Sequence, residues 1–299
     1  MRILLLGCGG QVGWELQRSL APLGELTALD FNSDGPWKAD FSRPESLGPM
    51  LQALRPALIV NAAAHTAVDR AETEPDLARR INATAVGELA AHAASAGALL
   101  VHYSTDYVFD GSGQHAREED APTGPLSVYG RTKLEGEQLI RDSGCDHLIL
   151  RTSWVYAARG GNFARTMLKL AAERDSLKVV ADQVGSPTGA DLLADLTAHM
   201  ARRTVGSRGL SGTYHVVADG HTSWFDYALH VVEWARQRGH PVRVARDHIL
   251  GVPSTDYPAP AARPLNSRLS TRKLRETFDL HPPAWQGGVE RMLAEVLGL

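Results

Sequence analysis

Tyr129 and Lys133 lie four residues apart in a stretch whose composition favours a helix. Pro125 precedes this stretch, and good helix formers continue through Ile140. On a helix, both side chains project from one face about a turn apart. A tyrosine titrates near ~10, so proton transfer near neutral pH requires its pKa to fall by roughly 3 units. A nearby ammonium supplies about that much stabilisation, which predicts a tyrosine acid with a lysine partner. The alternative is a solvent-exposed pair on an amphipathic helix.

A glycine-rich turn follows the first apolar run of the chain. Residues 3–6 have the composition of a buried parallel strand, and a helical pattern covers residues 14–20. Between them lie Gly7, Gly10 and Gly13. Glycine permits a sharp turn and a close approach to a pyrophosphate, which the positive end of the helix attracts. The order strand, turn and helix predicts a dinucleotide site, with a purely structural turn as the alternative.

A second apolar run, residues 26–29, ends at Asp30, which lies 23 residues after Gly7. A carboxylate at this distance is placed to accept hydrogen bonds from a ribose 2′-OH and would repel a 2′-phosphate. Asp30 therefore favours NADH. Lys38 could assist a phosphate, and a plain turn role for Asp30 is the alternative.

The chain then alternates between patterns of buried strands and of helices. We expect strands over residues 57–60, 99–103, 147–151, 177–180 and 213–217, and helices over residues 42–54, 76–96, 128–140, 163–174, 189–203 and 223–238. This order predicts a parallel sheet with right-handed crossovers and ligands at the carboxyl ends of its strands. Ser42 and Glu45 have the spacing of a capping box, and Asn82 in mid-helix is expected to be exposed.

Composition limits the class of protein. The chain has 299 residues, of which 43% are hydrophobic and 22% charged, so it can bury two cores. We expect one domain over residues 1–155 with returning segments near 189–217, and a second over 156–188 and 218–299. A net charge of -3 argues against nucleic acid or membrane as the main partner. Cys8 and Cys145 are the only cysteines, which fits a cytoplasmic protein.

Several motifs resemble those of the extended short-chain dehydrogenase/reductase family. They are Gly7-x-x-Gly10-x-x-Gly13, Asn61-Ala62-Ala63-Ala64, Ser104-Thr105-Asp106 and Tyr129-x-x-x-Lys133. Longer strings, which are distributed over nearly the whole length of the chain, are similar to one branch that reduces a nucleotide-linked keto sugar; they are residues 10–16, 61–69, 104–109, 151–156, 186–189 and 263–267. The resemblance implies an α/β fold, with a Rossmann-type doubly wound parallel sheet and a smaller C-terminal α/β substrate domain. It further implies reduction of the C4 ketone of dTDP-4-dehydro-L-rhamnose to dTDP-L-rhamnose by NADPH or NADH, in a pathway that leads to lipopolysaccharide O-antigen.

Residue roles follow from the same resemblance. Tyr129 would be the proton donor, Lys133 would lower its pKa and bind the ribose, and Thr105 would tune it. The cofactor-binding residues would be Gly7, Gly10, Gln11, Val12, Gly13, Asp30, Asp40, Phe41, Ala64, His65, Thr66, Tyr103, Tyr129 and Lys133. The dTDP-sugar would contact Thr105, Asp106, Trp154 and Arg263. A tyrosine and a threonine hydroxyl suit this reaction because negative charge grows on the ketone oxygen.

Three further points stay open. Some family members hold Mg²⁺ at a dimer interface, for which Glu15, Asp191 and Glu295 are the candidates, with surface acids as the alternative. The protein could be a monomer or a homodimer.

Other functions are possible on the same scaffold. One is a nucleotide-sugar epimerase or dehydratase, although dehydration needs a further acid beside the threonine, and Asp106 is followed by Tyr107. A non-catalytic NAD(P)-binding regulatory subunit is the third possibility.

Overall fold

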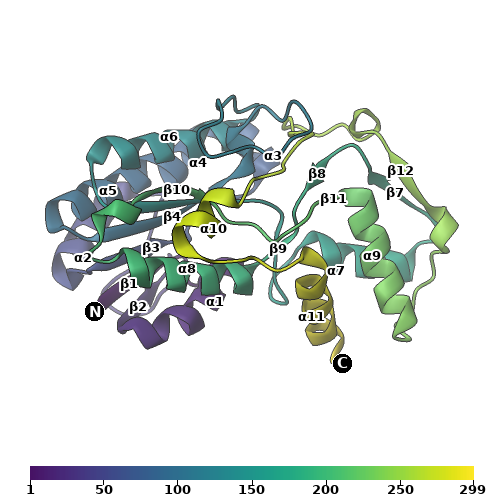
Figure 1. The fold of residues 1–299 in the computed structure, drawn as a ribbon, viewed down its shortest axis with the longest axis horizontal. Helices are drawn as coiled ribbons and strands as arrows, with labels where there is room; N and C mark the ends of the chain where they lie inside the picture. Colours follow the sequence, from purple (N-terminus) through teal and green to yellow (C-terminus); the bar gives the residue numbers. More distant parts are fainter.

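A six-stranded parallel sheet forms the centre of the larger part of the molecule (Figure 1). The computed structural model describes residues 1–299, apart from the side chain of Arg208. The strands have the spatial order β10-β5-β4-β3-β1-β2. Their bounds are β1 Arg2–Leu6, β2 Glu25–Leu29, β3 Leu58–Asn61, β4 Leu99–Thr105, β5 His147–Thr152 and β10 Gly212–His215. The predicted α/β fold with a parallel sheet is confirmed.

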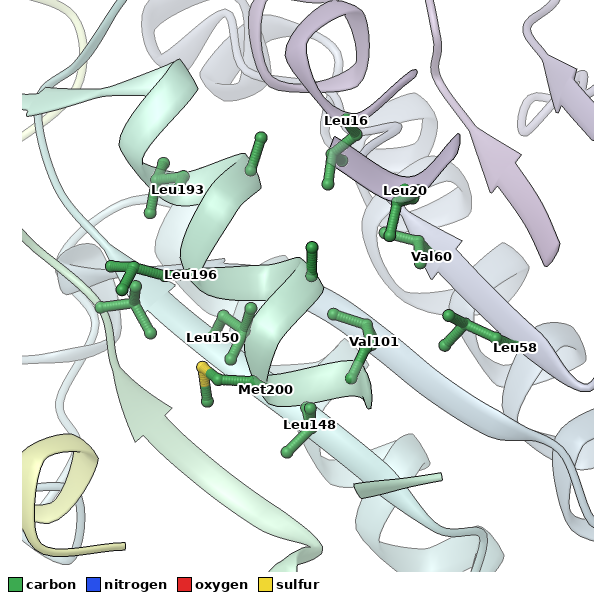
Figure 2. Packing of buried hydrophobic residues seen from close by; sticks show 14 of the residues in the cluster. Leu16, Leu20, Leu58, Val60, Val101, Leu148, Leu150, Leu193, Leu196 and Met200 are labelled. Atoms are coloured by element: carbon green, nitrogen blue, oxygen red, sulfur yellow. The ribbon is translucent and has the colours of Figure 1, made fainter. Parts of the chain in front are cut away.

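Helices cover both faces of this sheet. Successive strand residues point to opposite faces, so the apolar runs divide between two cores. On one face, residues such as Val60 and Val101 pack with α1 (Gln11–Leu20) and α8 (Ala190–Thr204), as Figure 2 shows. On the other face, residues such as Leu4 and Leu100 pack with the helices α2 (Leu47–Leu54), α5 (Ala85–Ala96) and α6 (Val128–Ser143). The sheet is therefore buried on both sides, which leaves its carboxyl edge for ligands.

The helix expected over residues 76–96 is interrupted. The structure has α3 (Val68–Thr73) and α4 (Pro75–Arg79), then a π-helical turn over Arg80–Thr84, and then α5. The turn directs Asn82 inward, where its side chain is 0% exposed. The expectation of an exposed Asn82 is therefore wrong. Its amide satisfies main-chain groups, and such buried groups need partners.

The predicted capping box at Ser42 is also absent. Ser42 Oγ donates to Asp40 Oδ1 (2.6 Å) instead of capping a helix. A 3₁₀ turn over Pro44–Ser46 precedes α2, which ends at Leu54 as expected. The remaining short 3₁₀ turns are Ala21–Leu23, Asp106–Val108, Arg208–Leu210, Arg246–His248 and Ser254–Asp256.

A separate core lies beside the sheet, and we call it the second core. It is built by α7 (Phe163–Glu173), β7 (Leu177–Val180), α9 (Trp224–Gln237), β12 (Ile249–Val252) and α11 (Trp285–Leu297). Short strand pairs connect it to the first core, namely β6 (Val155–Tyr156) with β9 (Thr188–Gly189) and β8 (Val184–Gly185) with β11 (Thr222–Ser223). Among the described residues, no helix combines the length and apolar character that crossing a membrane would require.

The chain passes between the two cores more than once. α8 and β10 return to the sheet after α7 and β7 have been formed. α10 (Arg272–Phe278) returns as well, and its Leu274 and Phe278 belong to the core of the sheet. This helix lies in the residue range that was expected to belong to the second domain. The expected domain limits stay a prediction. Figure 1 shows α10, drawn in yellow, beside β10.

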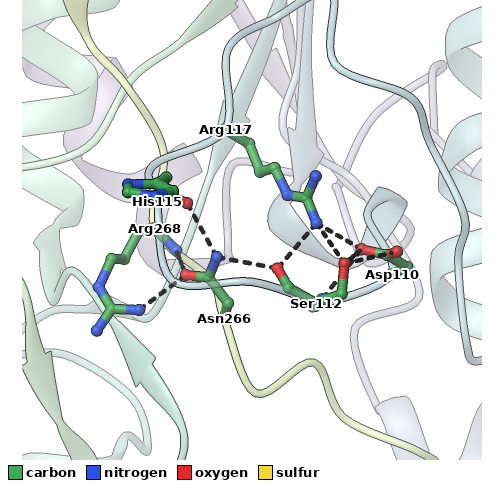
Figure 3. A network of polar contacts seen from close by, with 6 residues as sticks. All are labelled: Asp110, Ser112, His115, Arg117, Asn266 and Arg268. Carbon is green, nitrogen blue, oxygen red and sulfur yellow. Dashed lines mark hydrogen bonds and ion pairs between the residues drawn. The ribbon is translucent and has the colours of Figure 1, made fainter.

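A polar network fixes the segment that leads into α10. The buried Asn266 donates to the carbonyl oxygens of Ser112 (3.2 Å) and His115 (2.9 Å). Arg117 binds Asp110 Oδ1 (2.7 Å) and the Ser112 carbonyl (2.8 Å) in the same network (Figure 3). The network thereby ties residues near 266 to the loop that follows β4.

Candidate active site

A cavity of about 460 Å³ opens at the carboxyl ends of the sheet strands. It is lined by Gly10, Gln11 and Val12 at the start of α1; by Ala62, Ala64, Thr66 and Val68 after β3; by Tyr103, Ser104, Thr105, Asp106 and Tyr107 around the end of β4; by Tyr129 and Lys133 on α6; by Thr152, Ser153, Trp154 and Val155 around the end of β5; and by Trp224 on α9. Hollows of about 590 and 670 Å³ lie elsewhere, but none of the three expected catalytic residues lines them. The smaller cavity, which the expected catalytic residues line, is therefore the candidate active site.

Local contacts place the Tyr129 helix against this cavity. Ser127 Oγ accepts the amide hydrogen of Gly130 (3.2 Å), and Glu72 Oε1 accepts that of Val128 (2.7 Å), so the first turn of α6 is capped. A Cβ atom at Gly130 would lie 2.3 Å from the carbonyl oxygen of Tyr107. Because only glycine fits there, α6 packs directly on the backbone that follows β4.

Tyr129 differs from the expectation for its protonation. Burial raises the pKa of Tyr129 to about 12, and the hydrogen bond with Thr105 opposes this rise without cancelling it. The expected lowering of this pKa by Lys133 is therefore not found in the protein alone. The loss of water around the phenol outweighs the favourable contacts. Tyr129 consequently holds its proton at neutral pH.

Lys133 lies one turn from Tyr129 but bonds to other groups. Its Nζ lies 3.0 Å from His102 Nε2 and donates to the carbonyl oxygen of Tyr103 (2.6 Å). The side chain is 2% exposed, and burial lowers the pKa of Lys133 to about 7, against an opposing effect of Glu137. The amine is thus close to its titration midpoint at neutral pH.

Three buried polar atoms on the cavity wall have no hydrogen-bond partner among the described residues. They are Gln11 Oε1, Asp106 Oδ2 and Thr152 Oγ1. Burial raises the pKa of Asp106 to about 6, although hydrogen bonds from Ser267 and Thr105 oppose the rise. Unpaired buried polar groups are costly, so these atoms indicate a polar ligand in this cavity. Thr152 was missed from the sequence as a site residue, although it lies in one of the quoted strings.

Trp154 also lines the cavity. It adopts a left-handed backbone conformation with φ of 49°, which is unusual for a non-glycine residue. Its indole stacks on Trp224, the first residue of α9. Sequence reasoning missed Trp224, because nothing in the spacing of the two tryptophans relates them.

The glycine turn has the shape that a dinucleotide requires. Gly7 has φ of +82°, and a Cβ there would lie 2.6 Å from the amide nitrogen of Ala63. A Cβ at Gly13 would lie 2.0 Å from the carbonyl oxygen of Gly7, so strand, turn and helix pack without space for a side chain. Asp30 follows β2 and approaches the turn, since a Cβ at Gly9 would lie 2.7 Å from Asp30 Oδ2.

Other expected cofactor residues lie away from the cavity. Phe41 is 4% exposed and packs in the core on one face of the sheet. Asp40 accepts hydrogen bonds from the amide and hydroxyl of Ser42. The imidazole of His65 pairs with Glu74 (3.6 Å). The structure does not bring these side chains to the wall of the cavity.

Two sets of predicted charged residues form ion pairs within the protein. Arg263 Nη2 binds Asp69 Oδ2 (2.7 Å), which lowers the pKa of Asp69, and Arg263 does not line the cavity. The expected magnesium ligands Glu15, Asp191 and Glu295 line a separate hollow of about 250 Å³ together with Arg18 and Arg291. Asp191 pairs with Arg291, and Glu15 with Arg18 (3.8 Å). No group of three ligands suited to a metal ion occurs among the described side chains, so a magnesium site is not supported.

The chain is similar to known proteins over nearly its whole length. The family model described as "RmlD substrate binding domain" matches residues 1–297. The dTDP-4-dehydrorhamnose reductase of Salmonella typhimurium is 54% identical over 296 residues, which cover 99% of this chain and 98% of that protein. A dTDP-4-dehydrorhamnose reductase from Clostridium acetobutylicum has a similar crystal structure, with a TM-score of 0.88, 34% identity and full coverage of both chains. The Bacillus anthracis reductase, solved in complex with NADP, has a TM-score of 0.85 and 34% identity, covering 98% of this chain and 99% of that one.

Proposed function

Because this chain belongs to the family described as the RmlD substrate binding domain, we propose that it reduces the C4 ketone of dTDP-4-dehydro-L-rhamnose to dTDP-L-rhamnose with Tyr129, Lys133 and Thr105 as catalytic groups. It is an oxidoreductase that uses a nicotinamide cofactor and acts on a dTDP-linked sugar. One observation supports the assignment of these three residues. They line a single cavity beside the glycine turn, together with three buried polar atoms that have no hydrogen-bond partner among the described residues.

The protonation of Tyr129 suits a proton donor. Reduction of a ketone leaves negative charge on its oxygen, and an alkoxide is a far stronger base than a phenolate. A buried phenol with a pKa of about 12 still carries its proton at neutral pH and can give it to that oxygen. The Thr105 hydroxyl, which bonds to Tyr129, helps to stabilise the developing charge. When bound, the nicotinamide supplies the hydride.

The remaining cavity residues divide between the two ligands. Gln11 and Val12, at the amino end of α1, face the place where a pyrophosphate would meet the positive end of the helix. Lys133 would bind the nicotinamide ribose. Asp106 and Thr152, with unpaired oxygens, would bind sugar hydroxyls, and the Trp154 ring would cover an apolar face of the sugar.

The choice between the two nicotinamide dinucleotides centres on Asp30. Its Oδ1 accepts the amide hydrogen of Asn32 (2.8 Å), which holds the carboxylate beside Gly9. We infer that NADPH and NADH are both used and that Asp30 improves the binding of NADH. The free thiols of Cys8 and Cys145 support a location in the reducing cytoplasm. We propose that the protein acts there as a monomer or a homodimer. The product would then serve rhamnose-containing polysaccharides such as O-antigen.

A stopped assay tests the function. The protein is mixed with dTDP-4-dehydro-L-rhamnose and NADPH, nicotinamide absorbance is followed, and the sugar product is identified by NMR. We expect one cofactor oxidised for each dTDP-L-rhamnose formed. Sugar turnover without net oxidation of NADPH would indicate an epimerase, and cofactor binding without any turnover would indicate a regulatory subunit.

A further inference from the structure

A buried chain of side chains runs from β3 to Lys133. Asn61 is 1% exposed, and His102 on β4 is 0% exposed. The amide nitrogen of Asn61 lies 3.0 Å from His102 Nδ1, and His102 Nε2 lies 3.0 Å from Lys133 Nζ. Each contact joins two nitrogen atoms, so the position of every proton in this chain matters.

One main-chain group fixes the donor and the acceptor of every hydrogen bond in this series of side chains. The amide N–H of Ala63 can only donate, and it lies 3.0 Å from Asn61 Oδ1. That oxygen is therefore the acceptor, and the NH₂ group of Asn61 faces His102. Since the NH₂ group can only donate, His102 Nδ1 must accept, and it carries no proton.

The tautomer of His102 follows directly. A neutral imidazole has one protonated nitrogen, so the proton resides on Nε2. Complete burial and the proximity of Lys133 hold the pKa of His102 well below its usual value, which keeps the ring neutral. The Nε2–H bond then points at Lys133 Nζ. An ammonium group has no lone pair to receive it, whereas an amine does.

We propose that Asn61 and His102 form a relay that stabilises the uncharged amine form of Lys133 before the cofactor binds. The amine accepts from His102 Nε2 and donates one of its own hydrogens to the carbonyl oxygen of Tyr103. This deepens the proposed function, because it assigns a protonation state to one of its catalytic groups. Asn61 and His102 act through Lys133 and are positioning residues.

The charged groups around Lys133 do not overturn this state. On its own helix, Glu137 favours the ammonium, but Glu137 is fully buried between Arg151 (2.7 Å) and Arg141 (3.1 Å), which neutralise it. Tyr129 holds its proton, and Asp106 and Tyr107 line the same cavity after β4. Lys133 thus begins the cycle as a base that is able to take up a proton, and an anionic dinucleotide beside it would favour that uptake.

The relay can be read by NMR on the cofactor-free protein. Nitrogen shifts of labelled histidine distinguish the two ring nitrogens, and His102 is assigned by its loss in His102→Phe. We expect Nε2 protonated and Nδ1 bare at pH 8. The chain has only five lysines, so ¹³Cε signals can be followed through a titration, with Lys133→Met as the assignment. Lys133 should titrate near 7.

Two variants change the direction of the relay. In Asn61→Asp the carboxylate can only accept, so the proton of His102 moves to Nδ1, Nε2 becomes an acceptor, and the ammonium is favoured. Asn61→Leu removes the donor without adding charge. We expect the Lys133 midpoint to rise by at least about one pKa unit in Asn61→Asp, a tenfold change in the ratio of ammonium to amine, and by less in Asn61→Leu. Asn162→Asp, the same substitution at the start of α7, should leave the midpoint unchanged.

A protonated Nδ1 in the wild-type protein, or a Lys133 midpoint unaffected by both Asn61 variants, would overturn the relay. The wild-type tautomer decides the question even where a variant fails to fold. These measurements need no turnover, so they are independent of the reductase assay. A protein without reductase activity could still contain the relay, and an active reductase could lack it.

Discussion

The indole of Trp154 lies flat against the indole of Trp224, with ring centroids 3.5 Å apart and planes 10° apart. Trp154 follows β5 of the sheet, whereas Trp224 begins α9 of the second core. The stack therefore joins the two parts of the molecule at the wall of the cavity. Any ligand that rests on one ring is positioned by both parts.

Gly185→Ala should disturb this stack. A Cβ at Gly185 would lie 2.7 Å from Cε2 of Trp154, so the indole must move. We expect KM for the dTDP-sugar to rise about tenfold, equivalent to ~1.4 kcal/mol, while the Kd of NADPH stays the same. Steady-state kinetics and cofactor fluorescence measure the two. Gly287→Ala on α11 is the control, because a Cβ there meets nothing within 4 Å. An unchanged KM would mean that the sugar does not use this wall.

Tyr129→Phe should remove the proton donor and keep the ring. We expect kcat/KM to fall about 10²- to 10⁴-fold, with nearly unchanged NADPH binding. Tyr227→Phe is a matched control. Its hydroxyl is buried in the second core and has no hydrogen-bond partner among the described side chains, so its removal should not reduce activity. Near-normal kcat/KM in Tyr129→Phe would exclude Tyr129 as the donor.

Asn82→Ala should loosen the loop after β3. Asn82 accepts from the amide of His65 (2.8 Å) and donates to the His65 carbonyl (3.2 Å) and to Thr132 (3.1 Å). Leaving these groups unpaired should lower the free energy of unfolding by about 3 kcal/mol and weaken NADPH binding. Urea unfolding and cofactor titration test both effects. Asn162→Ala, which removes an N-cap, should cost about 1 kcal/mol and leave the Kd of NADPH unchanged.

Asp106→Asn should change stability with pH. The pKa of Asp106 is raised to about 6, so the carboxyl favours folding below pH ~4, and that contribution is lost as pH rises through about 6. The variant should therefore be more stable than wild type by about 3 kcal/mol at pH 8, with the difference vanishing towards pH 4. Urea unfolding at several pH values measures it. Asp110→Asn should show the opposite sign, because hydrogen bonds from Ser112 lower the pKa of Asp110.

Asp30→Ala should alter the preference for the cofactor. Loss of the ribose hydrogen bonds should weaken NADH binding about tenfold, whereas NADPH should bind equally well or more tightly. Titration of both dinucleotides gives the ratio of the two Kd values. The nearby exposed Asp34→Ala is the control. Equal effects of Asp30→Ala on the two cofactors would show that Asp30 does not read the 2′ position.

Much of the fold follows from local patterns. Apolar runs such as residues 3–6 predict buried strands, and glycine spacing predicts the turn after β1. The sequence does not show that Asn82 turns inward, because the interruption of its helix depends on contacts with α6. Gly136 of α6 packs on the Asn82 carbonyl oxygen, which would lie only 2.3 Å from a Cβ at position 136. Helix propensity describes an isolated segment, and tertiary packing overrides it here. The helices α10 and α11 were not predicted from the sequence.

The site was predicted less completely than the fold. The spacing of Tyr129 and Lys133 places them together, but it contains no information on burial or on His102. Burial reverses the expected direction of the Tyr129 pKa, and His102 engages the amine that was expected to act on the phenol. Trp224 was missed because the Trp154 stack forms only when distant segments meet.

The return of β10 and α10 to the sheet also constrains how the protein is made. Edge strand β10 and the apolar side chains of Leu274 and Phe278 leave the ribosome only after α7 and β7 of the second core have emerged. During translation, the exposed flank of β5 must wait for a partner strand that is encoded only after α8. During this interval of synthesis the edge of β5 has no partner strand and is prone to aggregate. Chaperones or rapid translation would protect it.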